Sequence, residues 1–148
     1  MPEIVGMHVD RLVTLEMRQM GSPSRGIVIP LYEAALRAQK RPLTLLAAER
    51  LQQSVKRGDF VIFMTGSGRA PWRPRGETDG PLGAVALGQA LATLGYAIHY
   101  VTDSYTGPLL ASLAPPAQPI HVWPVEGAEA SRQRARALLA QTQPVAVV

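Results

Sequence analysis

The sequence predicts an α/β fold of three layers, in which helices cover a parallel β-sheet, preceded by a helical N-terminal segment. Two observations lead to this prediction. From residue 58 onward, short apolar runs alternate with segments of helical length, which is the order of a parallel sheet with crossover helices. The residues before it show helical periodicity in two clear places. We therefore expect one α/β domain over residues 1–148, with a mainly helical lead-in at 1–57 and a βαβαβαβ region at 58–148.

Two helices are predicted in the lead-in. Ile29–Gln39 has apolar residues at the spacing of one helical face, and Leu43–Val55 begins after Pro42, which is expected in the first turn. The short connection between them folds one helix back on the other. Val9–Met17 fits both a helix and a strand, so its structure is left open.

The second region predicts four strands and three helices. Phe60–Met64 is a continuous apolar run, as in a strand buried on both faces. The next helix is expected over Pro81–Leu94, with Gly95 as its left-handed stop. The other expected strands are Ala97–Thr102, Ile120–Val125 and Pro144–Val148, and the other helices are Pro108–Leu113 and Ala128–Ala140. Because the last strand has no covering helix after it, we expect the chain to be part of a longer protein.

Composition excludes several functions. The 148 residues include no cysteine, so thiol chemistry, disulfides and cysteine-bound metals are absent. No stretch approaches the ~18 apolar residues of a membrane helix, and no signal peptide is evident, so we expect a cytoplasmic protein that does not contact a membrane. The formal charge is +4, but the basic residues are interleaved with acids and aromatics are only 5%. We therefore expect no nucleic-acid partner.

The loop after the first strand is the main candidate for chemistry. It runs over Thr65–Asp79, where such connections usually take about 2–6 residues, and it lies at the carboxyl edge of the sheet, where ligands bind. Gly66 and Gly68 allow a close approach of the backbone. Thr78 or Asp79 is expected to cap the following helix, with Gly80 and Pro81 in its first turn.

This loop matches neither common phosphate-binding signature. Glu77 and Asp79 place carboxylates at the positive end of the helix, where they disfavour phosphate and suit an ammonium group or a divalent cation. A carboxylate could be held by the loop's three arginines, Arg69, Arg73 and Arg75. The alternative is structural, with both acids only capping the helix and pairing with these arginines.

Three further side chains are candidates for a functional role. Asp103 ends the second strand at the same edge, so it either faces a ligand or starts a turn. His99 and His121 occupy matching places in successive strands and are expected to pack against a helix rather than to bind a metal. We therefore expect neither a metal nor a cofactor.

Two runs of residues resemble a known family. Val61-Ile62-Phe63-Met64-Thr65-Gly66 is followed by Glu77-Thr78-Asp79-Gly80-Pro81-Leu82-Gly83-Ala84-Val85-Ala86-Leu87. This arrangement is similar to the C-terminal domain of D-glutamate cyclase and its bacterial relatives, for which we expect a Rossmann-like fold. The resemblance implies a lyase that dehydrates D-glutamate to 5-oxo-D-proline. Family members continue past the last strand into further motifs. The resemblance therefore implies that this chain is the first half of a longer cyclase-like domain and could be inactive alone.

The resemblance implies a small acidic amino acid as substrate. Glu77 or Asp79 would hold or deprotonate its amine, and a loop arginine would hold a carboxylate. Backbone amides at Gly66–Gly68 would face the oxyanion. The full set of expected substrate-binding residues is Thr65, Gly66, Gly68, Arg69, Arg73, Arg75, Thr78, Gly80 and Asp103.

Two other classes of function are open. The sheet edge could belong to a binding module that holds a nucleotide, with Asp103 on a ribose hydroxyl, or an acidic amino acid without turnover. The chain could also be one part of an assembly, either a homo-oligomer or a half that docks a complementary second half through the strand edge at Val145–Val148.

Overall fold

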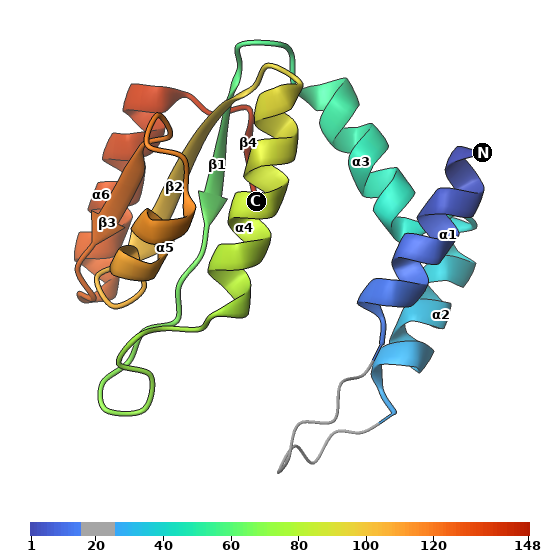
Figure 1. Ribbon diagram of the computed structural model, residues 1–148, viewed down its shortest axis with the longest axis horizontal. Coiled ribbons are helices and arrows are strands. Elements are labelled where there is room, and N and C mark those ends of the chain that lie inside the picture. The colour runs from blue at the N-terminus through green and yellow to red at the C-terminus, as the bar shows by residue number, and fades with distance from the viewer. Residues whose placement is uncertain (16–25) are drawn as a thin grey trace. The chain divides into compact units, whose positions relative to one another are not determined.

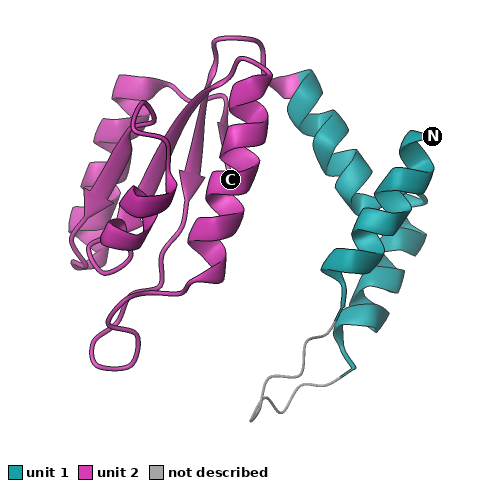
Figure 2. Cartoon of the chain, in the orientation of Figure 1, with its two compact units in different colours: residues 1–53 teal, residues 54–148 magenta. Residues whose placement is uncertain are grey.

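The computed structural model describes residues 1–15 and 26–148, and it divides the chain into two compact units, Met1–Gln53 (unit 1) and Ser54–Val148 (unit 2) (Figure 2). The division falls close to the change in sequence pattern expected at residues 57 and 58. In the described ranges, no helix has both the length and the apolar character needed to cross a membrane.

Unit 1 consists of three described helices, α1 (Pro2–Val13), α2 (Val28–Gln39) and α3 (Leu43–Ser54). The predicted bounds of α2 and α3 are confirmed to within one residue. Pro42 precedes α3 instead of lying in its first turn, and its carbonyl accepts the Leu46 N–H at 3.1 Å. Of the ambiguous segment Val9–Met17, the residues up to Val13 are helical, and its last two residues lie outside the described ranges.

A buried carboxylate joins the three helices of unit 1. Asp10 on α1 is 1% exposed, and it accepts the backbone N–H groups of Leu43 and Thr44 at 2.7 and 2.9 Å. It also accepts the hydroxyls of Thr44 and Tyr32 at 2.6 and 2.9 Å. Asp10 therefore caps the N-terminus of α3 from another helix. Burial acts to raise the pKa of Asp10, but these hydrogen bonds outweigh it and hold the pKa below its usual value.

Unit 2 contains a four-stranded parallel sheet in the order β3-β2-β1-β4, so the predicted parallel sheet is confirmed (Figure 1). Its strands are β1 (Phe60–Met64), β2 (Ala97–Asp103), β3 (Ile120–Trp123) and β4 (Ala146–Val147). β3 is shorter than predicted because Pro124 has no N–H to donate to the neighbouring strand. β4 is also shorter, although Val148 still donates to the Ile62 carbonyl at 2.9 Å.

Helices cover both faces of this sheet, which gives the expected three-layer, Rossmann-like α/β fold. α4 (Asp79–Thr93) and α5 (Gly107–Leu113) lie on one face and α6 (Ala128–Thr142) on the other (Figure 1). Leu138 of α6 packs with Ile62 and Val101 of the sheet. On the opposite face, α4 approaches so closely at Gly88 that a Cβ there would overlap the hydroxyl of Tyr100.

Candidate functional site

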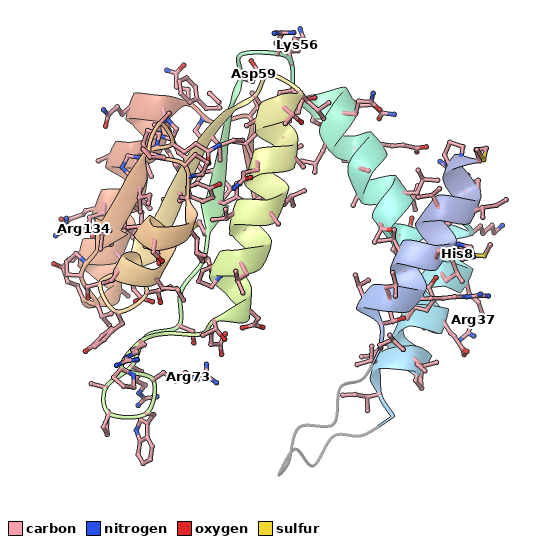
Figure 3. The ribbon with its side chains drawn as sticks, viewed as in Figure 1. His8, Arg37, Lys56, Asp59, Arg73 and Arg134 are labelled. Carbon is pink, nitrogen blue, oxygen red and sulfur yellow. The ribbon has the colours of Figure 1, made fainter. Side chains whose placement is uncertain are left out.

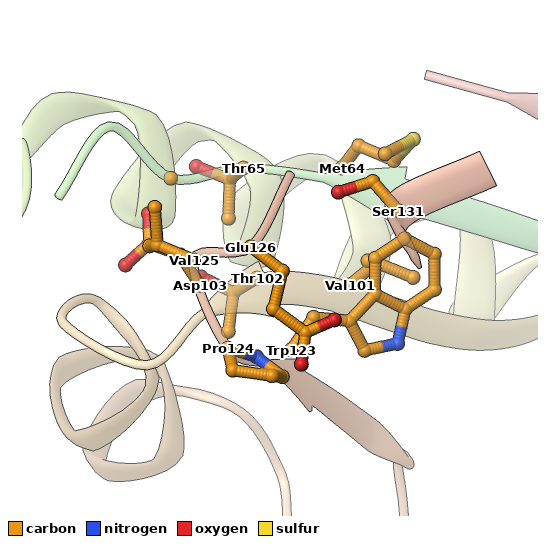
Figure 4. Close-up of a pocket in the computed structure, with 11 residues that line it drawn as sticks. Met64, Thr65, Val101, Thr102, Asp103, Trp123, Pro124, Val125, Glu126 and Ser131 are labelled. Carbon is orange, nitrogen blue, oxygen red and sulfur yellow. The ribbon is translucent and has the colours of Figure 1, made fainter. Parts of the chain in front are cut away.

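A pocket of about 350 Å³ lies at the carboxyl edge of the sheet, where the parallel strands β1, β2 and β3 end together. The loops that follow the three strands and the start of α6 form its wall (Figure 4). Its volume is at the small end of the ~300–1,000 Å³ range of ligand pockets. The lining residues are Met64, Thr65, Gly66, Val101, Thr102, Asp103, Trp123, Pro124, Val125, Glu126 and Ser131.

Asp103 organises this edge. Its Oδ1 accepts the N–H groups of Tyr105 and Thr106, both at 2.8 Å. Its Oδ2 accepts the Gly68 N–H at 2.9 Å and the Thr106 hydroxyl at 3.3 Å. Burial acts to raise the pKa of Asp103, but the hydrogen bonds from Gly68, Thr106 and Tyr105 outweigh it and hold the pKa below its usual value. Asp103 therefore fastens the loop after β1 to the turn after β2.

Two glycines make this fastening possible. A Cβ on Gly68 would overlap the Cβ of Tyr105, so only glycine lets the loop backbone reach the Asp103 carboxylate. At the other end of the loop, Gly76 has φ +72° and lies against the Thr106 side chain. The long loop is thus held at two points on the same turn.

The tip of the loop has its own structure. Arg69 and Arg73 form an antiparallel bridge, with N···O distances of 3.0 and 2.6 Å. The Arg73 guanidinium, labelled in Figure 3, donates to the Ser67 hydroxyl at 2.8 Å and pairs with Glu77. A second hollow of about 360 Å³ lies here, lined by Ser67, Arg69, Trp72 and Arg73. The indole of Trp72 is 79% exposed beside these cations.

The structure divides the predicted site residues into groups. Thr65, Gly66 and Asp103 line the pocket, whereas Arg69 and Arg73 line the hollow at the loop tip. The remaining predicted residues lie elsewhere on the loop or at the start of α4. The Gly68 N–H donates to Asp103, and Glu77 pairs with Arg73. Gly80 lies against the Thr65 hydroxyl. The other three, Arg75, Thr78 and Asp79, are exposed.

The expected cap of α4 is absent. Thr78 occupies the N-cap position, as predicted, but it has φ −96° and ψ −27° and its side chain donates or accepts no capping bond. Asp79 is the first helical residue and supplies a negative charge to the first turn. If the two acids have only a structural role, they are expected to pair with the loop arginines. The ion pair between Glu77 and Arg73 is such a contact.

The pocket also contains Trp123, Glu126 and Ser131, which are not among the predicted site residues. Glu126 directly follows the predicted third strand, so its position at the sheet edge was a signal for it. Its carboxylate accepts hydrogen bonds from Arg134 at 3.0 and 3.2 Å, which lower the pKa of Glu126. Ser131 reaches the pocket from α6, and no feature of the sequence alone indicates that contact.

The described lining of the pocket carries negative side chains and no positive ones. Its described lining includes two carboxylates, Asp103 and Glu126, and no lysine or arginine. Asp103 already accepts four hydrogen bonds, which fill the acceptor sites of a carboxylate. A ribose hydroxyl would have to displace one of them, and a phosphate would meet no cation here, so the nucleotide interpretation loses support.

Two histidines form a pair away from this edge. His99 Nδ1 and His121 Nε2 are 3.1 Å apart, and the rings are stacked with centroids 5.3 Å apart. Burial, followed by the neighbouring imidazole, lowers the pKa of His99. Among the residues that the structure describes, no three His, Asp or Glu side chains lie together as metal ligands.

One pocket residue carries a buried polar atom without a partner. Thr102 is 3% exposed, and among the described residues its Oγ1 has no hydrogen-bond partner.

We expect Thr102→Val, which keeps the shape of the side chain, to stabilise unit 2 by about 1 kcal/mol, because an unsatisfied buried hydroxyl costs ~1–3 kcal/mol. Urea unfolding followed by far-UV circular dichroism measures the change. Thr106→Val is the control, because its hydroxyl is bonded to Asp103, and it should destabilise the unit. A destabilised Thr102→Val would show that the hydroxyl has a partner in solution.

The fold and the pocket define an α/β protein that can hold a small molecule at the carboxyl edge of a parallel sheet. Within this class, residues 32–142 match the family described as D-glutamate cyclase-like, C-terminal. The match covers most of the chain, including the whole loop from Thr65 to Asp79, and the chain belongs to this family. No curated protein and no solved structure matches the sequence.

Proposed function

We propose that this chain binds D-glutamate and takes part in its dehydration to 5-oxo-D-proline. In this reaction the α-ammonium group loses a proton and the amine attacks the γ-carboxyl carbon. A C–N bond forms, the nitrogen loses a second proton, a C–O bond breaks, and the oxygen leaves as water with these two protons. The family match over residues 32–142 is the observation that carries the proposal. The hollow at the loop tip supports it because Arg69 and Arg73, which line it, suit the carboxylates of the substrate.

Glu77 and Arg73 supply the chemistry in this proposal. They form an ion pair in which each side chain is about half exposed, so a ligand can compete for it. A substrate carboxylate that binds Arg73 takes the place of Glu77, which then accepts the proton of the ammonium group. Arg69 lines the same hollow as Arg73 and offers a second donor to a carboxylate. Asp79 and Arg75 are the alternative base and the alternative carboxylate ligand.

The oxyanion needs a donor that is not already engaged. Gly68 N–H donates to Asp103, so it is not available to the substrate. Gly66 lines the pocket, and among the described residues its amide donates to no other group. We assign the oxyanion contact to the Gly66 amide for this reason.

Calorimetric titration of the full chain with D-glutamate, L-glutamate and 5-oxo-D-proline tests the binding step, and an assay of 5-oxoproline in the same samples tests turnover. We expect binding selective for the D-acid. Glu77→Gln should lower turnover by about 100-fold or more, the usual effect of removing a catalytic base. Glu33→Gln is the matched control, because Glu33 forms an exposed i,i+4 pair with Arg37 outside the site.

A binding module for an acidic amino acid is the second candidate. It is favoured because Glu77, Asp103 and Glu126 are already engaged in ion pairs or hydrogen bonds, so a proton from the substrate has to compete with these partners. Tight binding of D-glutamate without product would favour this candidate. Unchanged turnover in a folded Glu77→Gln variant would remove Glu77 from the mechanism.

A further inference from the structure

The two histidines of unit 2 belong to neighbouring strands and lie on one face of the sheet. His99 on β2 is in register with Ile62, and His121 on β3 is in register with Val101. Side chains in register on neighbouring strands point to the same face of a sheet. Ile62 and Val101 both pack with Leu138 of α6, so the two imidazoles lie on the α6 side of the sheet.

The facing nitrogens of these rings have the separation of two ligands on one metal ion. His99 Nδ1 and His121 Nε2 are 3.1 Å apart. A histidine nitrogen binds zinc at about 2.0–2.1 Å, so two of them on one ion are about 2.8–3.4 Å apart, for angles from a right angle to the tetrahedral angle. The distance between the two nitrogens therefore needs almost no change when the pair binds an ion.

Contacts within the sheet hold the His99 ring in place. The ring of Phe60 on β1 meets it edge-on, with centroids 5.1 Å apart and planes at 89°. Burial, followed by the neighbouring imidazole, lowers the pKa of His99, so this ring is neutral near neutral pH and can offer a nitrogen lone pair to a metal. Ligands on regular strands are positioned more precisely than ligands on loops.

A hydrogen bond between the two rings competes with a metal. Without an ion, one ring donates its N–H to the other, and this proton lies between the two facing nitrogens. Neutral imidazole has two tautomers, so the donating ring can carry the same proton on its far nitrogen instead. Binding an ion therefore requires a change of tautomer in one ring and no loss of a proton from the pair.

The type of ligand selects the metal. Imidazole suits zinc, copper and nickel, whereas magnesium and calcium require oxygen ligands. In the described ranges, no Asp or Glu joins the two histidines to make a set of three ligands. Two protein ligands leave the other positions of the ion to water, so the site differs from the closed, four-ligand sites that hold structural zinc.

We propose that His99 and His121 form a two-histidine site for Zn²⁺ or a similar divalent transition metal, which joins the edge strand β3 to β2. Neither histidine lines the pocket at the carboxyl edge or the hollow at the loop tip, so the site is separate from the residues of the proposed function. An ion that binds the folded pair and not the unfolded chain stabilises unit 2. The sequence predicts only packing for these histidines, because they are 22 residues apart along the chain and the sheet brings them together.

Calorimetric titration of the full chain with zinc chloride tests the site, and magnesium chloride supplies the control ion. We expect one Zn²⁺ to bind per chain and no Mg²⁺ to bind. His99→Gln and His121→Gln should each lose the binding of Zn²⁺. His8→Gln is the matched control and should bind Zn²⁺ like the parent, because His8, labelled in Figure 3, is the third histidine of the chain and lies on α1. A parent that binds no Zn²⁺, a His99→Gln variant that binds it equally well, or a His8→Gln variant that loses it would overturn the proposal.

Nuclear magnetic resonance of the parent chain tests the site without a variant. Zn²⁺ should shift the imidazole signals of His99 and His121 and leave those of His8 in place. It should also raise the midpoint of thermal unfolding of the parent but not of His99→Gln. Shifts confined to His8, or a midpoint that Zn²⁺ raises equally in both proteins, argue against a site at the pair. Circular dichroism of each variant confirms that it is folded.

Discussion

Asp103→Asn is expected to destabilise unit 2 by about 2–3 kcal/mol, since hydrogen bonds to a charged group contribute ~1.5–3 kcal/mol and this carboxylate accepts four bonds. The asparagine amide has one acceptor oxygen and turns two donors toward N–H groups that also donate. The loss should separate the loop at Gly68 from the turn after β2. Urea unfolding of the full chain measures the stability, and hydrogen exchange at Gly68, Tyr105 and Thr106 measures the local opening.

The effect of Asp103→Asn should depend on pH. Because the pKa of Asp103 in the folded chain lies below its ordinary value of 3.8, folding favours the ionised form. This stabilisation is complete above the unfolded pKa and is lost as the pH falls through the folded pKa. The difference in stability between parent and variant should therefore be largest near neutral pH and shrink below about pH 4.

A matched carboxylate separates this effect from a general loss of charge. Asp59 accepts one hydrogen bond, from the N–H of Lys56 three residues earlier, and it belongs to the same unit. Asp59→Asn should cost clearly less than Asp103→Asn and leave exchange at Gly68 unchanged. Equal effects of the two variants, or a stability gap that does not change with pH, would contradict the assigned role of Asp103.

The order of strands and helices in unit 2 follows from local sequence. The apolar run at Phe60–Met64 and the glycine stop at Gly95 are signals within a few residues, and the structure confirms both elements that they predict. The ends of two strands differ from the prediction. β3 ends early because Pro124 has no N–H to donate, and the length of β4 depends on its pairing with β1. Local patterns therefore predict the layers better than their edges.

Long-range contacts explain what the sequence did not predict. Asp103 was a candidate ligand because it ends a strand, yet its main partner on the loop, Gly68, is 35 residues away along the chain. The sequence predicts one site for the loop arginines and the pocket residues because they belong to one segment. The loop instead carries Arg69 and Arg73 to a hollow of their own, held by the bridge between them.

Local sequence patterns also fail to predict all of helix α1 in unit 1. Its N-terminal half was not predicted, because its contact face is Glu3, Gly6 and Asp10 and not an apolar stripe. A single aspartate gives no periodic signal, although it determines where α3 begins. The apolar residues from Val9 onward fit both a helix and a strand, and the helix that forms is attached through its other side.

Asp10→Ala is expected to destabilise unit 1 by about 3 kcal/mol. The change leaves the N–H groups of Leu43 and Thr44 without their cap at a buried site, and a lost cap costs ~0.5–2 kcal/mol before the cost of further unsatisfied groups is added. It also removes the partner of Tyr32, so α1, α2 and α3 lose their common contact. Hydrogen exchange of the full chain should show faster exchange throughout α3 and unchanged protection in β1 and β2.

Two variants with smaller expected effects on stability serve as references for Asp10→Ala. Tyr32→Phe removes one of the four bonds to Asp10 and should have a smaller effect in the same direction, whereas Glu33→Gln changes an exposed ion pair and should have almost none. Acid should reproduce the effect of Asp10→Ala in the parent, because the pKa of Asp10 is lowered in the folded chain, so its contribution is lost as the pH falls through that pKa. If α3 keeps its protection in Asp10→Ala, the helix is capped by another group, and the contact that attaches α1 to unit 1 must be sought at Gly6 and Glu3.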